Sequence, residues 1–286
     1  MNGRAKRIVA PAPEALARAA ALLREGRLVA FPTETVYGLG ADASNVRAVR
    51  RIFEVKGRPG DHPLIVHVSS VTAAKRWARE WPEGARALAD AFWPGPLTLI
   101  VPRAADVADA VTGGQDSIGL RVPSHPVAQA LLAAFEAIGG SGIAGPSANR
   151  FGHVSPTTAA HVDADLGADV DMIVDGGASD VGIESTIVAF VRALPVLMRP
   201  GFIPIDALER VLRAPLHALD ADAPRASGTL ASHYAPRTRA FLVAADALRT
   251  EIDRRSERDQ RTAVLARTGT APEGFDGTWL DRKSDV

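Results

Sequence analysis

Hydroxyl side chains gather directly after an apolar run near the N-terminus. Leu28–Phe31 is apolar, and Thr33 and Thr35 follow it, with Gly38 and Gly40 a few residues further on. Alternate residues of an extended chain project to the same face, so the two threonines are expected to point together. Glycine lets the backbone approach a ligand closely. We expect a ligand cradle here; the alternative is a strand that ends in a polar turn.

Two cations flank a glycine at the end of the next expected helix. Lys56 supplies a mobile point charge and Arg58 a planar fork, a complementary pair for phosphate oxygens. The alternative is an ordinary helix C-terminus, where cations interact favourably with the helix dipole. His67 follows in an apolar strand, on the same side as Ile65.

Further polar residues punctuate later apolar segments. Ser117 and Arg121 share one face of an expected strand. An arginine in an apolar strand needs an anion, which is either a ligand group or a structural Asp or Glu. Ser147 and Asn149 lie in a turn bounded by glycine and proline, where both can bond a nucleotide or the backbone. Ser185, at a strand start, is followed later by Arg199.

Several common nucleotide and metal motifs are absent or weak. GxxxxGK[ST] does not occur, and GLGADA (38–43), which fits a loose dinucleotide fingerprint, lies past its strand and lacks the matching acidic residue. The chain has no cysteine, no HExxH motif and seven scattered histidines. We therefore expect no disulfide and no dedicated metal site.

The composition indicates a soluble α/β protein. In 286 residues, 33 basic side chains balance 33 acidic ones, so a pervasive basic field for nucleic acid is not expected, although a local basic cleft is compatible. No apolar stretch reaches the length of a membrane span, and the N-terminal region has the pattern of an amphipathic helix rather than a signal peptide. We expect a cytoplasmic protein without a membrane partner.

Strand and helix patterns interleave along the chain, which predicts helices layered on a twisted sheet. Ser155 before Pro156 is typical of a helix N-cap. The expected strands are Leu28–Phe31, Leu64–Val68, Leu97–Val101, Ser117–Val122, Met172–Val174 and Thr186–Val191. The expected helices are Pro13–Glu25, Asn45–Val55, His125–Ala137, Pro156–Leu166 and Ile205–Arg213.

The pattern changes after the last of these helices. Residues 214–238 are rich in Pro, Ala, Ser and Gly and are interpreted as a linker. Residues 239–286 offer a strand (Ala240–Val243), a helix (Ala244–Arg255) and another strand (Thr262–Ala266). A segment this short can bury only a small hydrophobic core of its own.

Together the motifs resemble the Sua5/YrdC family, the L-threonylcarbamoyladenylate synthases. The matches, in family order, are PTETVYGLG, KGRP with HPLIVHV, FWPGPLT, LRVPSHP, GPSAN, GIESTIV and RPG. The resemblance implies an α/β fold with a YrdC-like twisted mixed sheet, flanked by helices and holding a concave ligand cleft. It divides the chain into a catalytic domain (14–213), a linker or lid (214–238), to which SHYAP belongs, and a small, partial Sua5-type α/β C-terminal domain (239–286).

The same resemblance implies a reaction. L-threonine, bicarbonate or CO2, and ATP with Mg²⁺ would give threonylcarbamoyl-AMP and pyrophosphate for t6A37 modification of tRNA by the downstream threonylcarbamoyl-transferase machinery. Lys56 and Arg58 would neutralise phosphate charge during the transfer. The implied threonine pocket comprises Thr33, Thr35, His67, Arg121 and Ser185. The implied ATP contacts are Arg58, His62, Ser117, Ser147, Asn149, Ser155, Arg199 and Tyr234.

The chain departs from the family pattern at three places, and two other functions stay open. His62 stands where many members have asparagine, Ser227-Gly228 replaces a proline-glycine pair at the linker start, and the C-terminal segment is shorter than the family's second domain. One alternative is an RNA-binding translation or ribosome-maturation factor, which would show salt-dependent RNA affinity without ATP turnover. The other is a carbamoyl-phosphate-dependent adenylating enzyme, whose relatives carry cysteine-rich zinc fingers that this chain lacks.

Overall fold

The computed structural model describes residues 7–192, 194–218, 224–226, 238–257, 261–266 and 270–281. The chain divides between residues 235 and 236 into two compact units. Tyr234 and most of the expected linker lie outside the described residues. Within the described residues, no helix has the length and apolar character needed to cross a membrane.

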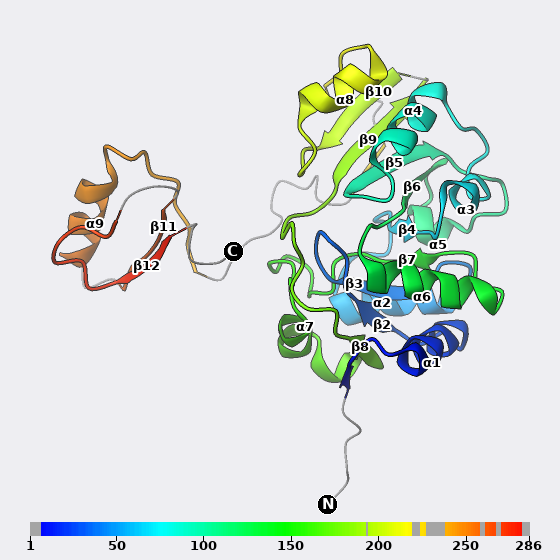
Figure 1. Cartoon of the computed structure of the whole chain (residues 1–286), viewed down its shortest axis with the longest axis horizontal. Coiled ribbons are helices and arrows are strands. Elements are labelled where there is room, and N and C mark those ends of the chain that lie inside the picture. Colours follow the sequence, from blue (N-terminus) through cyan, green and yellow to red (C-terminus); the bar gives the residue numbers. More distant parts are fainter. Residues whose placement is uncertain are drawn as a thin grey trace, which may run out of the picture. The chain divides into compact units, whose positions relative to one another are not determined.

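In the described part of the first unit, ten short strands form one mixed sheet (Figure 1). Parallel and antiparallel neighbours alternate irregularly across it, as expected for a YrdC-like sheet. In spatial order the strands are β1 (Ile8–Val9), β8 (Met172–Val174), β2 (Val29–Phe31), β3 (Gly38–Asp42), β7 (Ile143–Ala144), β4 (Ile65–His67), β6 (Ser117–Arg121), β5 (Leu97–Pro102), β9 (Thr186–Val191) and β10 (Leu194–Arg199).

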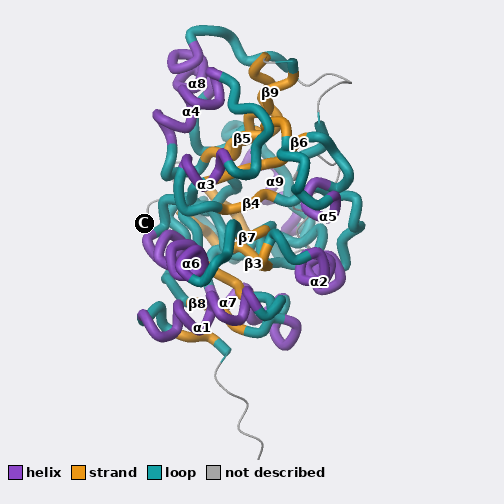
Figure 2. Tube along the Cα trace, turned by 90° about the vertical axis from the view of Figure 1, so that its right-hand side faces the viewer, coloured by secondary structure: helices purple, strands orange, loops and turns teal. Residues whose placement is uncertain are grey.

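Helices cover both faces of the sheet because the strands are apolar on both sides. In β2, Val29 and Phe31 pack with α1 (Pro13–Arg24) and α6 (Pro126–Ala137), whereas Ala30 belongs to the core on the other face. That second core includes the apolar stripe of α2 (Val46–Lys56). Figure 2 shows α1 and α6 on one side of the strands and α2 on the other.

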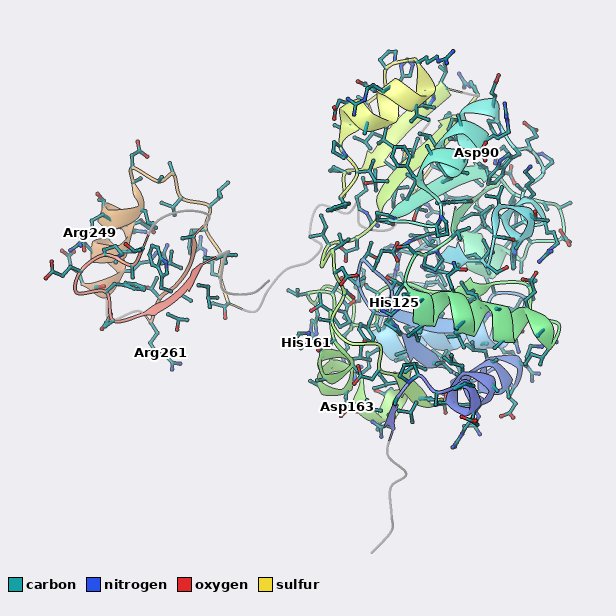
Figure 3. The ribbon with its side chains drawn as sticks, viewed as in Figure 1. Asp90, His125, His161, Asp163, Arg249 and Arg261 are labelled. Carbon is teal, nitrogen blue, oxygen red and sulfur yellow. The ribbon has the colours of Figure 1, made fainter. Side chains whose placement is uncertain are left out.

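Local chemistry sets the helix boundaries. The Asn45 side chain accepts hydrogen bonds from the first turn of α2, and the helix ends at Gly57, which adopts a left-handed conformation with φ 61°. His125 accepts from the Val127 amide at the start of α6 (Figure 3). The remaining helices of this unit are α3 (Val71–Lys75), α4 (Glu83–Phe92), α5 (Asp109–Thr112), α7 (Ala159–Asp165), a 3₁₀ turn η1 (Gly167–Asp169) and α8 (Ile205–Leu212).

The predicted N-cap at Ser155 is wrong. Thr158 caps α7, its side chain accepting from the His161 amide. The chain stays irregular before it because the Pro156 carbonyl accepts from the Tyr37 amide at 2.9 Å and is engaged with another segment. Ser155 instead donates to the Glu184 carboxylate.

The segment that resembled a dinucleotide loop forms the central strand β3. A Cβ added at Gly40 would lie 2.9 Å from the Val29 carbonyl oxygen, and one at Gly38 would lie 3.1 Å from the Phe31 ring. These two glycines therefore make room for β2, and their backbone is held in the sheet rather than in a turn.

The second unit contains α9 (Leu248–Ser256) and a parallel pair of strands, β11 (Ala263–Ala266) and β12 (Thr278–Asp281). Its buried centre is small: Ile252, Val264 and Ala266. The predicted strand at Ala240–Val243 is wrong, since this segment has no regular structure. Phe241 packs beneath the guanidinium groups of Arg239 and Arg255 instead, at 4.9 and 4.0 Å from the ring centroid.

Candidate active site

A polar pocket lies over the middle of the sheet, where β3, β7, β4 and β6 are neighbours. Hydroxyl, imidazole and guanidinium groups from segments far apart in the sequence converge there. The lining residues are Thr33, Thr35, Val36, Tyr37, Gly38, Arg58, Ile65, His67, Arg121, Gly145, Pro146, Ser147, Glu184, Ser185 and Arg199.

The two threonines of the β2–β3 loop are buried and point together, as the sequence predicts. Their Oγ1 atoms are 2.9 Å apart, and Thr33 Oγ1 donates to the Val36 carbonyl at 2.6 Å. Arg121 Nη1 donates to Thr35 Oγ1 at 2.8 Å. The hydroxyls are thus oriented before any ligand binds, which reduces the entropic cost of binding.

Arg121 has the anion that its burial requires. Its Nη2 lies 2.7 Å from Glu34 Oε1, and the two side chains are 4% and 7% exposed. Glu34 Oε2 accepts from the Ser124 amide at 3.1 Å. The sequence left open whether the anion that Arg121 needs is a ligand group or an acidic side chain. The structure identifies the side chain of Glu34 as this anion, and the pair orients Arg121 toward the pocket.

His67 is neutral at physiological pH. Burial, followed by the charge of Arg121, lowers its pKa to about 3. Its Nδ1 is buried and has no hydrogen-bond partner among the described residues, and a Cβ on Gly145 would lie 2.9 Å from it. The imidazole meets the Phe31 ring edge-on at 5.6 Å. A glycine beside it leaves this nitrogen space for a partner from the pocket.

Arg58 lines the pocket, whereas Lys56 supports it from outside. Lys56 Nζ donates to the carbonyls of Ser147 and Asn149 at 2.5 and 2.6 Å. Burial, followed by the charge of Arg58, lowers the pKa of Lys56 to about 7. Lys56 therefore holds the Ser147–Asn149 turn against the end of α2.

The remaining corner of the pocket is built on Ser185 and Arg199. Arg199 donates through Nε and Nη2 to the Ser185 carbonyl at 3.1 and 2.9 Å. The Ser185 hydroxyl is paired with Thr98 Oγ1 at 2.8 Å. These bonds fix the start of β9 against the end of β10.

Of the expected site residues that the structure describes, five lie outside the lining. His62 Nδ1 accepts from Arg58 Nε at 3.2 Å, and Ser155 donates to Glu184, so each contacts a lining side chain. Ser117 lines a separate small cavity that shares Ile65 with the pocket. The other two residues, Lys56 and Asn149, contact each other, since Lys56 Nζ donates to the Asn149 carbonyl.

Two carboxylates at the site were missed as functional residues. Glu34 stands between the two threonines in a bent segment, and Arg121 contacts both Thr35 Oγ1 and Glu34 Oε1. Glu34 could have been predicted from the sequence, because a buried arginine needs an anion nearby. Glu184 directly precedes Ser185, and nothing in its local sequence distinguishes it.

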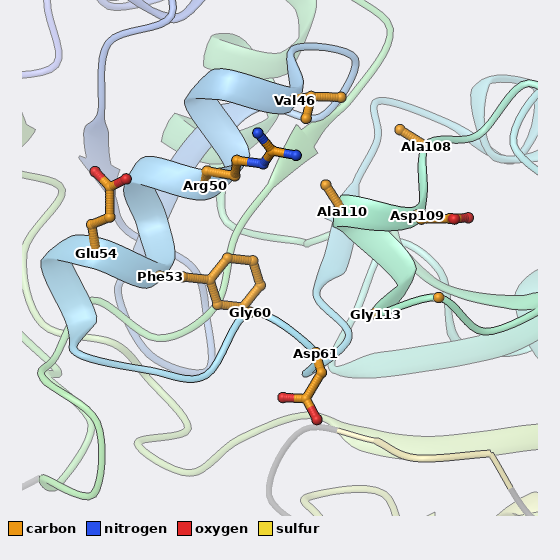
Figure 4. Close-up of a pocket in the computed structure, with 11 residues that line it drawn as sticks. Val46, Arg50, Phe53, Glu54, Gly60, Asp61, Ala108, Asp109, Ala110 and Gly113 are labelled. Carbon is orange, nitrogen blue, oxygen red and sulfur yellow. The ribbon is translucent and has the colours of Figure 1, made fainter.

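A larger cavity of about 720 Å³ lies elsewhere, between α2 and α5 (Figure 4). Phe53 and Ala110 lie on its two sides, with Arg50, Glu54 and Asp109 around it. None of the expected site residues lines it. We therefore assign the functional site to the smaller polar pocket.

The fold and the pocket define a class: an α/β protein with a pocket lined by guanidinium and hydroxyl groups over the centre of a mixed sheet. A Sua5/YciO/YrdC family model, described as "Telomere recombination", matches residues 21–201. A second model, described as "Threonylcarbamoyl-AMP synthase, C-terminal domain", matches residues 203–285. The chain belongs to the Sua5/YciO/YrdC family, as its motifs predict.

Two curated relatives are named threonylcarbamoyl-AMP synthase. The protein from Pyrococcus abyssi is 44% identical over 230 residues, which cover 79% of this chain and 66% of the relative. The protein from Bacillus subtilis is 45% identical over 227 residues, covering 77% and 64%. The chain thus spans just under two thirds of the length of these relatives.

Solved structures agree with the fold. The crystal structure of P. abyssi Sua5 complexed with L-threonine is 38% identical, with a TM-score of 0.86 over 96% of this chain and 83% of that one. E. coli YciO, at 22% identity and a TM-score of 0.60 over 70% of this chain and 97% of that one, shares the fold.

Proposed function

We propose that this chain is a threonylcarbamoyl-AMP synthase, a nucleotidyltransferase that forms L-threonylcarbamoyladenylate and pyrophosphate from L-threonine, bicarbonate or CO2, and ATP. The single observation that carries the proposal is the charge of the pocket: Arg58, Arg121 and Arg199 line it together with one glutamate. Such a pocket suits a ligand pair with several anionic groups, as an amino-acid carboxylate and a triphosphate are. The names of the curated relatives and the threonine complex of P. abyssi Sua5 support it.

In this proposal the amino acid occupies the deeper part of the pocket. Thr33, Thr35, His67 and Ser185 are all at most 3% exposed and surround Arg121. Arg121 would hold the carboxylate, and the neutral imidazole and the hydroxyls would read the substrate hydroxyl. A site that hydrogen-bonds a substrate hydroxyl discriminates strongly against analogues that lack it.

ATP would occupy the side formed by Arg58, Ser147 and Arg199. Lys56 and Asn149 support this side through the turn, and His62 accepts from Arg58. Ser155 would contact ATP next to Glu184, the carboxylate to which it donates. Ser117 would contact ATP from the neighbouring small cavity, since Ile65 lines both that cavity and the pocket. Tyr234 would cover the nucleotide from the linker and shield the mixed anhydride from water.

The reaction needs positioning and charge neutralisation more than a covalent nucleophile. The threonine amine is carboxylated, a carbamate oxygen attacks the α-phosphate, and pyrophosphate leaves. Mg²⁺ would enter with ATP. Among the described residues, no three His, Cys, Asp or Glu side chains are grouped to hold a metal ion, so phosphates and water would supply most of its ligands.

The test is threonine-dependent release of pyrophosphate from ATP in the presence of bicarbonate, with serine and no-amino-acid controls. We expect release only when L-threonine and bicarbonate are both present. Arg58→Ala should lower the rate by about 100-fold or more, since one guanidinium facing the phosphates would be lost. No release by the folded wild-type chain would refute the proposal, and salt-dependent RNA binding by the same sample would favour the RNA-binding alternative.

The downstream partners follow from the same proposal. A mixed anhydride is short-lived in water, so a consumer must accept the threonylcarbamoyl group soon after it forms. We infer that the consumer is the threonylcarbamoyl-transferase machinery that modifies position 37 of tRNA in the cytoplasm. Addition of that machinery and tRNA to the assay should convert the adenylate to t6A.

A further inference from the structure

Glu184 has a place in the pocket that the proposed reaction does not yet use. Of the described residues that line the pocket, it is the one carboxylate. Ser155 Oγ donates to its Oε1, and the neighbouring Ser185 backbone is held by two bonds from Arg199. The side chain is partly exposed, and it is anchored at one oxygen.

An α-amino acid carries one charge of each sign next to each other. The guanidinium groups and hydroxyls of the lining suit its carboxylate, and an ammonium group needs an acceptor, best an ionised one. Glu184 directly precedes Ser185 and lines the same pocket as Arg121 and Thr35. On these grounds we propose that Glu184 binds the ammonium group of the amino-acid substrate and thereby selects for amino acids. The inference rests on the proposed function.

Lys56 and Arg121 each have other partners. Lys56 donates to two backbone carbonyls, and Arg121 is paired with Glu34. Glu184 acts on Lys56 through its charge, which raises the pKa of the lysine against the larger effect of burial. The bond from Ser155 engages Oε1, and a carboxylate has a second oxygen that can accept a hydrogen bond from a ligand.

The test is calorimetric binding to the full-length chain. The ligands are L-threonine, 3-hydroxybutyrate, which lacks the ammonium group, and a non-hydrolysable ATP analogue with Mg²⁺. Wild type should bind threonine and bind 3-hydroxybutyrate much more weakly. Glu184→Gln should weaken threonine binding by about 10- to 100-fold, the loss of one charge-assisted bond. It should leave the affinities for 3-hydroxybutyrate and the nucleotide unchanged.

Matched variants separate this role from others. Glu184→Asp should retain part of the threonine affinity, and Ser155→Ala should cause a smaller loss than Glu184→Gln. Glu54→Gln, an exposed carboxylate at the other cavity, should change no affinity. Thermal unfolding of each variant checks its fold.

Two outcomes would overturn the inference with the proposed function intact. In one, Glu184→Gln binds threonine as wild type does. In the other, it loses affinity for the Mg²⁺-bound nucleotide and keeps that for threonine, which would assign the carboxylate to the nucleotide's metal. If wild type itself binds no threonine, the proposed function fails together with the inference.

Discussion

At the scale of single residues, the buried pair of Arg121 and Glu34 couples stability to binding. Replacing Glu34 by glutamine leaves the guanidinium at 4% exposure without its counter-charge. We expect Glu34→Gln to lower the free energy of unfolding by about 3–5 kcal/mol, as is typical when one partner of a buried pair is removed. Threonine affinity should fall as well, since Arg121 loses its orientation. Urea unfolding and calorimetry measure the two effects.

An exposed pair provides the control. Glu83 and Arg86 are 3.4 Å apart on α4, with side chains 88% and 55% exposed. Pairs of this kind contribute little to stability. Glu83→Gln should unfold at the same urea concentration as wild type. Equal urea midpoints for Glu34→Gln and Glu83→Gln would show that the fold does not need the ionised Glu34 beside Arg121.

Lys56 makes stability depend on pH in the alkaline range. The unfolded chain keeps the Lys56 proton up to about pH 10.5, whereas the folded chain releases it near pH 7. Between these values the unfolded chain binds more protons, so the free energy of unfolding rises with pH, by at most about 1.4 kcal/mol per unit. Relative to Lys56→Met, wild type should therefore gain stability between pH 7 and pH 9. Parallel pH profiles for the two proteins in urea unfolding would contradict the lowered pKa.

At the scale of elements, strands with an uninterrupted apolar run were predictable. The strands β3 and β10, which contain glycine or proline, and the two-residue strands were not. Met172–Val174 and Thr186–Val191 occur as predicted, because a continuous apolar run between polar segments has few other uses. The two-residue strands Ile8–Val9 and Ile143–Ala144 carry no periodicity of their own. Tertiary pairing alone defines them.

In the site, too, some residues could be predicted from the sequence and others could not. Thr33, Thr35 and Arg121 were predictable because hydroxyls and a cation in apolar surroundings need partners. The supporting position of Lys56 was not, because it depends on the Ser147–Asn149 turn, some 90 residues away in the chain. Sequence alternation cannot reveal contacts between segments that far apart.

The cap of α7 provides a test at this scale. The Thr158 side chain accepts from the His161 amide, so Thr158→Ala should lower the free energy of unfolding by about 1 kcal/mol. Ser155→Ala, three residues earlier, removes no cap and should leave the helix unchanged. Urea unfolding compares the two variants. A larger stability loss in Ser155→Ala would restore the N-cap first expected there.

At the scale of the whole molecule, the described part of the linker is bound to the first unit. Arg225 exchanges two hydrogen bonds with the Gln115 side chain, at 2.6 and 3.2 Å, and Ala226 is buried among Ile100, Ile187 and Met198. The sheet and its helices end before this segment. The linker anchor thus belongs to the first unit, which holds the pocket.

Truncation tests this division. A fragment of residues 1–226 should fold and bind L-threonine as the full chain does, since every described residue of the pocket lies within it. A fragment of residues 1–218 lacks the anchor and should be less stable by about 1–2 kcal/mol, through lost apolar burial and hydrogen bonds. Thermal and urea unfolding compare them. Failure of the longer fragment to fold would show that the first unit needs residues beyond 226.

The rate at which Lys56 is acylated should report how often the turn around it opens. An amine with a pKa of about 7 is largely an uncharged nucleophile at pH 8, yet this one is 4% exposed and enclosed by the turn that it holds. Acylating reagents can therefore reach it only when that turn opens, whereas the exposed Lys75 reacts at once. Mass spectrometry of Lys56 acylation over time would report how often the pocket wall opens, and a ligand that closes the wall would slow the reaction.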